Sequence, residues 1–411
     1  MSRGVLLVLA AVMAAPDAAA QQPPAGPRPV TREQAVQAAL ASGGAVRLGQ
    51  ADTAAAVAVM GMARALRNPS FGFTYSKSAP TWHAIVDVPL DLPWWRGLRS
   101  DASRAGLAAA REQYAYTRAS VRFGVEAAYG RALAAAERAN LSRQGARDAD
   151  SLLTLARRQR DAGDASDLDV DLATINAGQL ANAAAGDGQD AVVALLDLQL
   201  LMGLGAEAPQ ITLTDSVAAL LASLPDAGAV PAVQVNGLPL RVSAAAAALR
   251  STEFGLRLAH RRASLMPSFQ FGVEWGDPSE KGALPVIGVA LPLPLFHNYG
   301  AEVALANAER SRAAVELEVA ERETASDLAR ARLALSVSRE RLSRDVAMLA
   351  TARAVAVKAL TAYREGAAAL PAVLQAQRAA REAQQQYVED VVAVATAGAA
   401  MRLVTTIEVP Q

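Results

Sequence analysis

Four short segments of the chain alternate between apolar and polar positions with a period of two residues, as β-strands with two different faces do. They form two pairs, joined by short loops at Lys77 to Thr81 and at Gly276 to Ala283. One face is rich in aromatic residues: Phe71, Phe73, Tyr75, Trp82, Phe269, Phe271 and Trp275. The other face includes Asp87, Asp91, Gln270 and Glu274. We predict two β-hairpins with strands of about 9–10 residues, the length of a tilted strand that crosses a bilayer.

Long stretches without proline follow both hairpins and predict very long helices. They run from about Leu98 to Arg160 and from about Ala301 to Arg364. At about 1.5 Å per residue each would be roughly 95 Å long, far beyond the usual helix of a globular protein. Such helices must pack side by side in a coiled-coil-like assembly. Shorter helices are expected at Thr31–Leu66, Asp167–Met202, Pro239–Leu265 and Pro371–Leu403.

The chain contains an internal sequence repeat. The Pro-Ser-Phe sequence at Pro69 recurs at Pro267, and the turn at Gly163 recurs at Gly366. Recurrence at a nearly constant offset of about 200 residues indicates two copies of one unit. The expected organisation is a signal peptide (1–20), a Pro-rich segment (21–30), a first helix–hairpin–helix unit (31–203), a connection (204–238), a second unit (239–404) and a tail (405–411).

The N-terminus has the pattern of a secretory signal, with Arg3 before a short apolar run and Ala18-Ala19-Ala20 before Gln21. No later apolar run has the length and purity of a membrane-spanning helix, which argues against a helical inner-membrane protein. Acidic and basic residues balance at 40 each, which argues against a nucleic-acid partner. The chain has no cysteine, so it forms no disulfide.

Four strands cannot close a barrel, and an open sheet edge is not tolerated in lipid. The strands of several chains must therefore combine, and three chains would give twelve strands with room for a lumen. The predicted fold class is an α+β membrane protein. It has long helices in a coiled-coil-like assembly and four transmembrane β-strands per chain, which close as a 12-stranded barrel in a trimer; the resemblance described next implies that the helices form a long α-helical barrel. Outer-membrane lipid would contact the aromatic face, and Asp87, Asp91, Gln270 and Glu274 would face the lumen.

These residues and their order resemble the outer-membrane efflux protein family, the TolC-like exit ducts of tripartite pumps. The resemblance rests on the Pro-Ser-Phe strand entry, the Pro-Leu-x-Leu exit at Pro89 and Pro292, and the turn formed by Gly163, Ser166, Leu168 and Val170. It implies a homotrimeric outer-membrane duct whose α-barrel crosses the periplasm to meet an adaptor protein and an inner-membrane efflux pump. It further implies that the adaptor contacts both turns, at Gly163, Ser166, Leu168, Val170, Gly366, Leu370 and Val373. The second turn departs from the pattern because it has no serine.

The first turn is acidic. It carries Asp161, Asp164, Asp167 and Asp169 near one another. Repeated around a narrow axis, these carboxylates would form a negative ring that gates the periplasmic tip. The alternative is a solvated turn in which Asp167 serves as the helix N-cap, which we prefer for that residue.

Aromatic residues also mark the passage from strand to helix, at Trp94, Trp95 and Phe296. They suit an interfacial girdle, and they equally suit packing at a strand–helix corner. No catalytic set, metal site or cofactor motif is present: none of the three histidines has a second ligand at metal spacing. The competing functions are a periplasmic adaptor and a soluble coiled-coil scaffold. The duplicated hairpins with their alternating strands speak against the adaptor, and fractionation would separate the scaffold from the duct.

Overall fold

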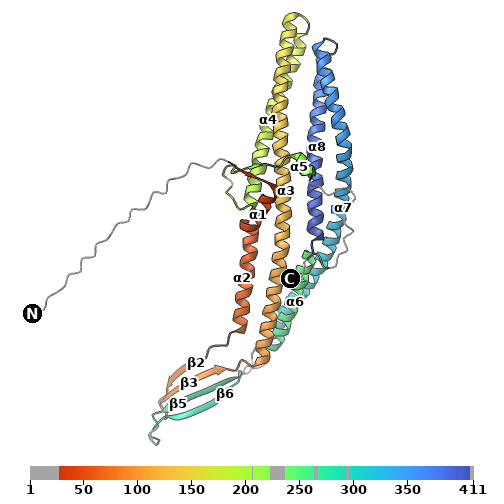
Figure 1. The fold of residues 1–411 in the computed structure, drawn as a ribbon. Coiled ribbons are helices and arrows are strands. Elements are labelled where there is room, and N and C mark those ends of the chain that lie inside the picture. The colour runs from red at the N-terminus through yellow and green to blue at the C-terminus, as the bar shows by residue number, and fades with distance from the viewer. Residues whose placement is uncertain are drawn as a thin grey trace, which may run out of the picture.

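The computed structural model describes residues 27–205, 207–222, 237–262, 267–280, 282–292, 296–297 and 299–407. These residues form an elongated molecule with a small sheet at one end and two helical hairpins reaching away from it (Figure 1). The expected signal peptide lies outside the described residues, as do residues 223–236 of the expected connection and 408–411 of the expected tail.

Two very long helices form the body of the molecule. Helix α3 (Pro93–Ala162) has 70 residues and α7 (Gly300–Arg364) has 65. Each turns back into a shorter antiparallel partner, α4 (Asp167–Leu201) or α8 (Leu370–Thr405). The two resulting hairpins contact each other through α3 and α8. The prediction of long helices is confirmed, although α3 begins earlier than Leu98 because a proline is accommodated in the first turn of a helix.

The helix expected from Thr31 to Leu66 is in fact two helices, α1 (Arg32–Ser42) and α2 (Gly44–Arg64). The predicted capping box between Thr31 and Gln34 is present. The break comes at Gly43, whose backbone is extended and passes so close to Ala39 and Leu201 that a side chain would clash. The equivalent helix of the second unit is α6 (Leu240–Arg262), which packs against both α3 and α7.

The sheet contains four antiparallel strands in the order β2-β3-β5-β6. They are β2 (Ser70–Tyr75), β3 (Trp82–Pro89), β5 (Ser268–Trp275) and β6 (Leu284–Ala290). The two predicted hairpins therefore join edge to edge through β3 and β5, one from each repeat. At 6, 8, 8 and 7 residues the strands are shorter than the predicted 9–10, because they end where the loops and the prolines begin.

The segments expected to be mere linkers form part of a packed layer on the helices. Strand β1 (Arg28–Val30) pairs in parallel with β4 (Ile211–Leu213), and α5 (Val217–Ala222) packs on α8. The buried hydroxyl of Tyr129 on α3 donates a hydrogen bond of 3.0 Å to the carbonyl of Val30. This layer ties both linkers to the middle of the long helices.

Candidate functional site

One face of the sheet is apolar throughout. The strand register places Phe71 beside Val86 and Val86 beside Phe271, so successive strands align their apolar positions. Trp82 and Trp275 stack with ring centroids 6.5 Å apart. The aromatic residues of this face are Phe71, Phe73, Tyr75, Trp82, Phe269, Phe271 and Trp275. No helix of the described chain covers them, and Phe71 is 69% exposed. The predicted alternation of the strands is confirmed.

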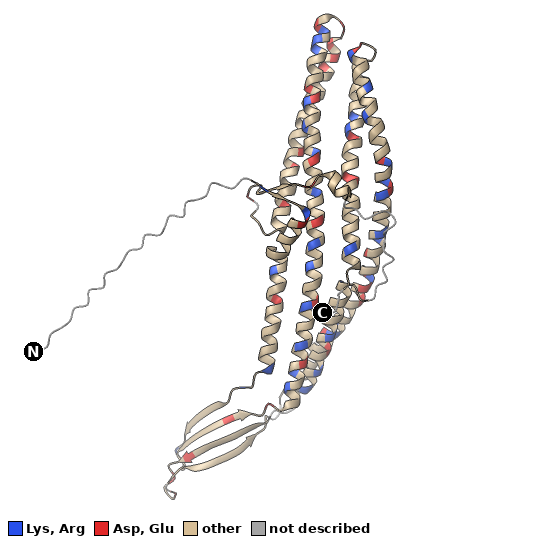
Figure 2. Ribbon diagram, in the orientation of Figure 1, with Lys and Arg blue, Asp and Glu red and all other residues tan. Residues whose placement is uncertain are grey.

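The opposite face carries a polar network that joins the two repeats. The Asp87 carboxylate accepts hydrogen bonds from Ser268 at 2.7 Å and from Gln270 at 2.9 Å. The His83 Nδ1 atom lies 2.9 Å from a carboxylate oxygen of Glu274. Of the four residues predicted to face a lumen, the structure thus brings Asp87, Gln270 and Glu274 together on one face. In Figure 2 the four strands are almost entirely tan, with isolated red segments where acidic residues lie.

Asp91 was expected on the same face and lies elsewhere. Strand β3 ends at Pro89, and Asp91 follows it in the passage to α3. Its carboxylate accepts two hydrogen bonds from Arg99, at 2.7 and 2.6 Å, and is only 3% exposed. The paired geometry of guanidinium and carboxylate holds the strand end against the first turns of the helix. Asp91 is therefore a structural residue of this corner.

Some aromatic residues at the strand–helix corners fit an interfacial girdle, and others fit packing within the corner. Trp94 is 60% exposed and Phe296 is fully exposed, as a girdle requires. Trp95 is only 8% exposed, because it points into the corner where α3 begins. Its assignment to the girdle is wrong for a single chain, and its burial supports the packing alternative.

The first tip, between α3 and α4, is capped by Ser166. Its hydroxyl accepts from the backbone N–H of Asp169, and the Asp169 side chain accepts from the backbone N–H of Ser166. This capping box replaces the expected cap at Asp167, whose side chain is 91% exposed. Asp161 pairs with Arg160 at 2.7 Å, and Asp164 is exposed. Gly163 has a φ of 87°, a left-handed conformation that favours glycine.

The second tip, between α7 and α8, is built differently. Gly366 is again left-handed, but the N-cap residue Ala369 has no side-chain hydrogen bond. Three residues predicted to contact an adaptor are buried between the hairpins: Val170 is 9% exposed, Leu370 1% and Val373 0%. They join an apolar cluster with Tyr363, so they hold the two tips together instead of presenting a surface. Leu168 is 65% exposed, and Gly163, Ser166 and Gly366 are exposed as well.

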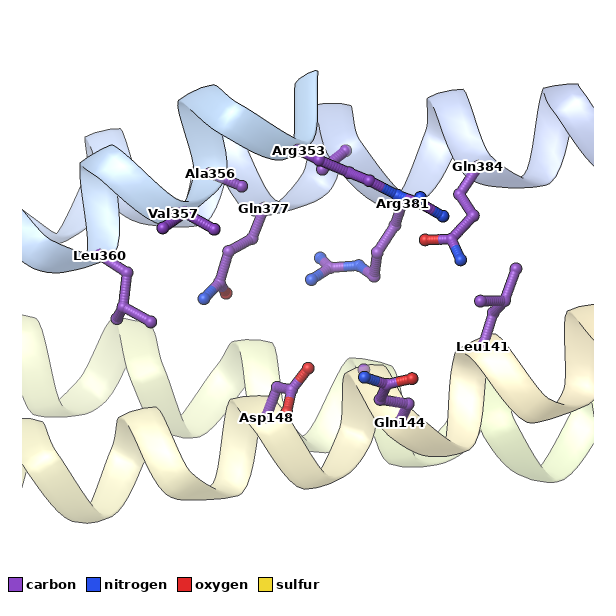
Figure 3. A pocket seen from close by; sticks show the side chains of 12 residues that line it. Leu141, Gln144, Asp148, Arg353, Ala356, Val357, Leu360, Gln377, Arg381 and Gln384 are labelled. Carbon is purple, nitrogen blue, oxygen red and sulfur yellow. The ribbon is translucent and has the colours of Figure 1, made fainter. Parts of the chain in front are cut away.

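A pocket of about 380 Å³ opens between the hairpins below the tips, where α3, α7 and α8 meet (Figure 3). Arg353, Arg381, Gln377 and Gln384 line it opposite Asp148. Burial lowers the pKa of Arg381, and the charge of Asp148 acts in the opposite direction. The sequence showed no sign of this pocket, because its residues come from three distant segments.

Two further buried groups escaped prediction. Asp345 on α7 and Asp390 on α8 are 6% and 1% exposed. They lie on the apolar seam of the second hairpin, near Leu342 and Val391. Within the described residues, no group of three or more His, Asp or Glu side chains is placed to hold a metal ion.

The sequence and the fold of the chain were compared with those of known proteins. Residues 34–204 match the sequence model described as outer membrane efflux protein. The solved structure of the outer-membrane channel OprN is 19% identical, with 91% of this chain and 89% of that chain covered and a TM-score of 0.71. The CmeC channel of Campylobacter jejuni is 16% identical, with 91% and 85% covered and a TM-score of 0.74. VceC of Vibrio cholerae is also 16% identical, with 91% and 95% covered and a TM-score of 0.71. A search of curated proteins found no match.

The first unit of the chain is thus similar to the outer membrane efflux protein family. The family match covers the first unit, and the fold match extends over both. The predicted fold of the chain, long helices with four strands, is that of the TolC-like channels. Solved structures that share this fold are described as outer-membrane channels.

Among the described residues, one helix, α7, contains a stretch long and apolar enough to cross a membrane by length and composition. This differs from the expectation that no such stretch follows the signal. A single helix of this kind is weak evidence for a span, and only 11% of the stretch is buried in the lone chain. In this chain α7 follows β6, and its exposed stretch is apolar surface that another helix can cover.

Proposed function

We propose that this protein is the exit duct of a tripartite efflux system, which conducts substrates passively from a periplasmic tunnel to the exterior as a homotrimer. The observation that carries the proposal is the open, two-faced sheet. Within the described chain, β2 pairs only with β3 and β6 pairs only with β5, so each has an edge of free backbone groups. Unpaired backbone groups are very unfavourable in lipid, so these edges require other chains.

Three copies satisfy this requirement with a usable pore. Two copies would give eight strands, and a barrel of that size is filled by its own side chains. Three copies give twelve strands and leave a lumen. The apolar face, from Phe71 to Trp275, would then meet lipid, and the network around Asp87 and Glu274 would line the lumen.

The long helices also support assembly. Their exposed sides carry apolar residues that a single chain leaves uncovered, among them Val346 at 52% and Val357 at 66% exposed on α7. Helices of this length with large exposed apolar positions are typical of a helical wall completed by neighbouring copies.

The helical tips are the natural place for the adaptor and, beyond it, the inner-membrane pump. The exposed turn residues Gly163, Ser166, Leu168 and Gly366 are available for contact with an adaptor. The exposed or partly exposed acids Asp161, Asp164, Asp167 and Asp169 would form a negative ring at this end when three chains surround one axis. Val170, Leu370 and Val373 would support these turns from behind.

Fractionation with cross-linking tests the assembly. The full chain should be extracted from the outer membrane by detergent as a heat-modifiable trimer, and cysteines placed on β2 and β6 should cross-link between chains. A control pair on β3 and β5 should cross-link within one chain. Recovery as a soluble monomer, or cross-linking at β2 and β6 within one chain, would overturn the proposal.

A further inference from the structure

The buried carboxyls of Asp345 and Asp390 form an incomplete hydrogen-bonding arrangement. Asp390 pairs with Arg341 through one oxygen, at 2.6 Å. The second oxygen of Asp390 and one oxygen of Asp345 are buried without a partner among the described residues. Two ionised carboxylates cannot hydrogen-bond each other, since neither has a proton to donate. An unpaired buried charge is also strongly destabilising.

The repeat shows what the arrangement lacks. Gly163 and Gly366 are 203 positions apart, and the same 203 positions relate Ser142 to Asp345 and Asp187 to Asp390. In the first hairpin the buried hydroxyl of Ser142 donates a hydrogen bond to the carboxylate of Asp187. The second hairpin keeps the acceptor, Asp390, and replaces the hydroxyl donor by a second carboxyl.

We propose that Asp345 and Asp390 form a proton-binding site, in which one shared proton supplies the hydrogen bond that Ser142 supplies in the first hairpin. This inference does not depend on the proposed duct. It rests on the two buried oxygens without partners and on the equivalence of the two hairpins.

The charged groups around the pair do not compensate both carboxylates, which is consistent with one bound proton. On α7, Arg341 contacts Asp390, and Arg344 acts on Asp345 but is itself paired with Glu340. On α8, the neighbouring Glu389 is paired with Arg138 of α3. Helix α5, which also packs on α8, has no charged residue. One guanidinium therefore faces two carboxyls directly, which leaves one negative charge that a proton neutralises.

The direction in which pH changes the stability of the hairpin follows from the pKa of Asp345. Burial first, and then the neighbouring Asp390, raise the pKa of Asp345 from 3.8 to about 6. A folded-state pKa above the unfolded one means that the folded state binds the proton more tightly. The stabilisation is complete below about pH 4 and is lost as the pH rises through about 6. The pair thus ties α7 to α8 in acidic surroundings and loosens the hairpin above about pH 6.

The test compares the full-length, detergent-solubilised protein with Asp345→Ser, which restores the donor of the first hairpin. The matched control is Glu318→Gln, which removes an exposed carboxylate of α7 that pairs with Arg322. Unfolding midpoints are measured from pH 4 to 8. Infrared spectra of wild type and of Asp345→Ser are recorded over the same range, and their difference isolates the carbonyl stretch of the shared protonated carboxyl.

The wild-type midpoint should fall by about 3 °C more than that of Asp345→Ser between pH 4 and 8. Glu318→Gln should keep the wild-type slope. The wild-type spectrum minus that of Asp345→Ser should show the carbonyl band at pH 4 and lose it by pH 8. An unchanged slope in Asp345→Ser would overturn the proposal. If that variant does not fold, Asp345→Asn takes its place, and a difference spectrum without that band overturns the proposal by itself.

Discussion

The two helical hairpins are built on one repeat, yet they treat equivalent positions in opposite ways. Ser166 at the first tip corresponds to Ala369 at the second, and the exposed Asp167 corresponds to the buried Leu370. In the interior, Ser142 corresponds to Asp345. The first hairpin thus closes its helix end with side-chain hydrogen bonds and leaves its acids on the surface. The second inserts apolar residues between the tips and places its acid in the seam.

This difference teaches that duplication preserved the backbone and left the side chains free to specialise. The first tip is held by a local cap, so its surface is available for contacts. The second is held by burial against the first, so its turn needs no polar cap. Substitutions at equivalent positions should therefore have unequal effects.

The largest difference is expected between Leu370→Ala and Asp167→Ala. Removal of the Leu370 side chain, which is 1% exposed, leaves a cavity between the tips and should lower the free energy of unfolding by about 2–4 kcal/mol. Asp167→Ala should change it by no more than about 0.5 kcal/mol. Thermal unfolding followed by circular dichroism measures both. Equal effects would show that the tips are not held as described.

Ser142→Asp should transfer the pH dependence to the first hairpin. A second buried carboxyl beside Asp187 should lower the free energy of unfolding by about 2–3 kcal/mol at pH 8, and most of this loss should be regained at pH 4. Unfolding curves at the two pH values check this. Ser142→Ala is the control, because it removes the donor without adding a titrating group. A loss in Ser142→Asp that does not vary with pH would contradict the comparison.

The caps provide a smaller effect of opposite sign. Ser166→Ala should destabilise the start of α4 by about 1 kcal/mol, because the capping hydrogen bond is lost. Ala369→Ser should stabilise the start of α8 by up to about 1 kcal/mol, because it introduces a cap where none exists. Hydrogen exchange of the first-turn amides reports each helix start separately. If Ala369→Ser left the exchange at α8 unchanged, its backbone geometry would not accept a cap.

The smallest effect is expected from Asp161→Asn at the first tip. Asp161 pairs with Arg160 at 2.7 Å, but its side chain is 66% exposed and water screens the pair. The free energy of unfolding should change by less than about 0.5 kcal/mol. In planar bilayers, however, the same variant should reduce the preference of the channel for cations, since it weakens the proposed ring. Unchanged selectivity would remove Asp161 from that ring.

Much of the fold could be predicted from local pattern. Alternation in the strands fixed which residues share a face, and the absence of proline indicated the long helices. Gly43 shows what local pattern lacks: it breaks the first helix because it packs against Leu201, which is distant in sequence. Burial of Trp95, Val170 and Val373 likewise depends on partners from other elements.

The buried seam of α7 shows which part of the Asp345–Asp390 pair could be predicted from the sequence and which could not. Its buried residues Leu335, Ser338, Leu342, Asp345 and Leu349 recur at alternating spacings of three and four, as in a coiled coil. The acidic residue at one of these buried positions could have been noticed by following this spacing along the sequence. That Asp390 is its partner could not be predicted from the sequence, because the packing of α7 against α8 determines which residues face each other.

The pairing of β3 with β5 has a consequence for how a ring of sheets is put together. These strands come from different repeats, so one seam between hairpins is made inside each chain as it folds. In the proposed trimer every second seam is then already closed before any two molecules meet. Encounters between chains need to form only the β2 to β6 seams. Joining two repeats in one chain therefore lowers the dependence of ring closure on concentration.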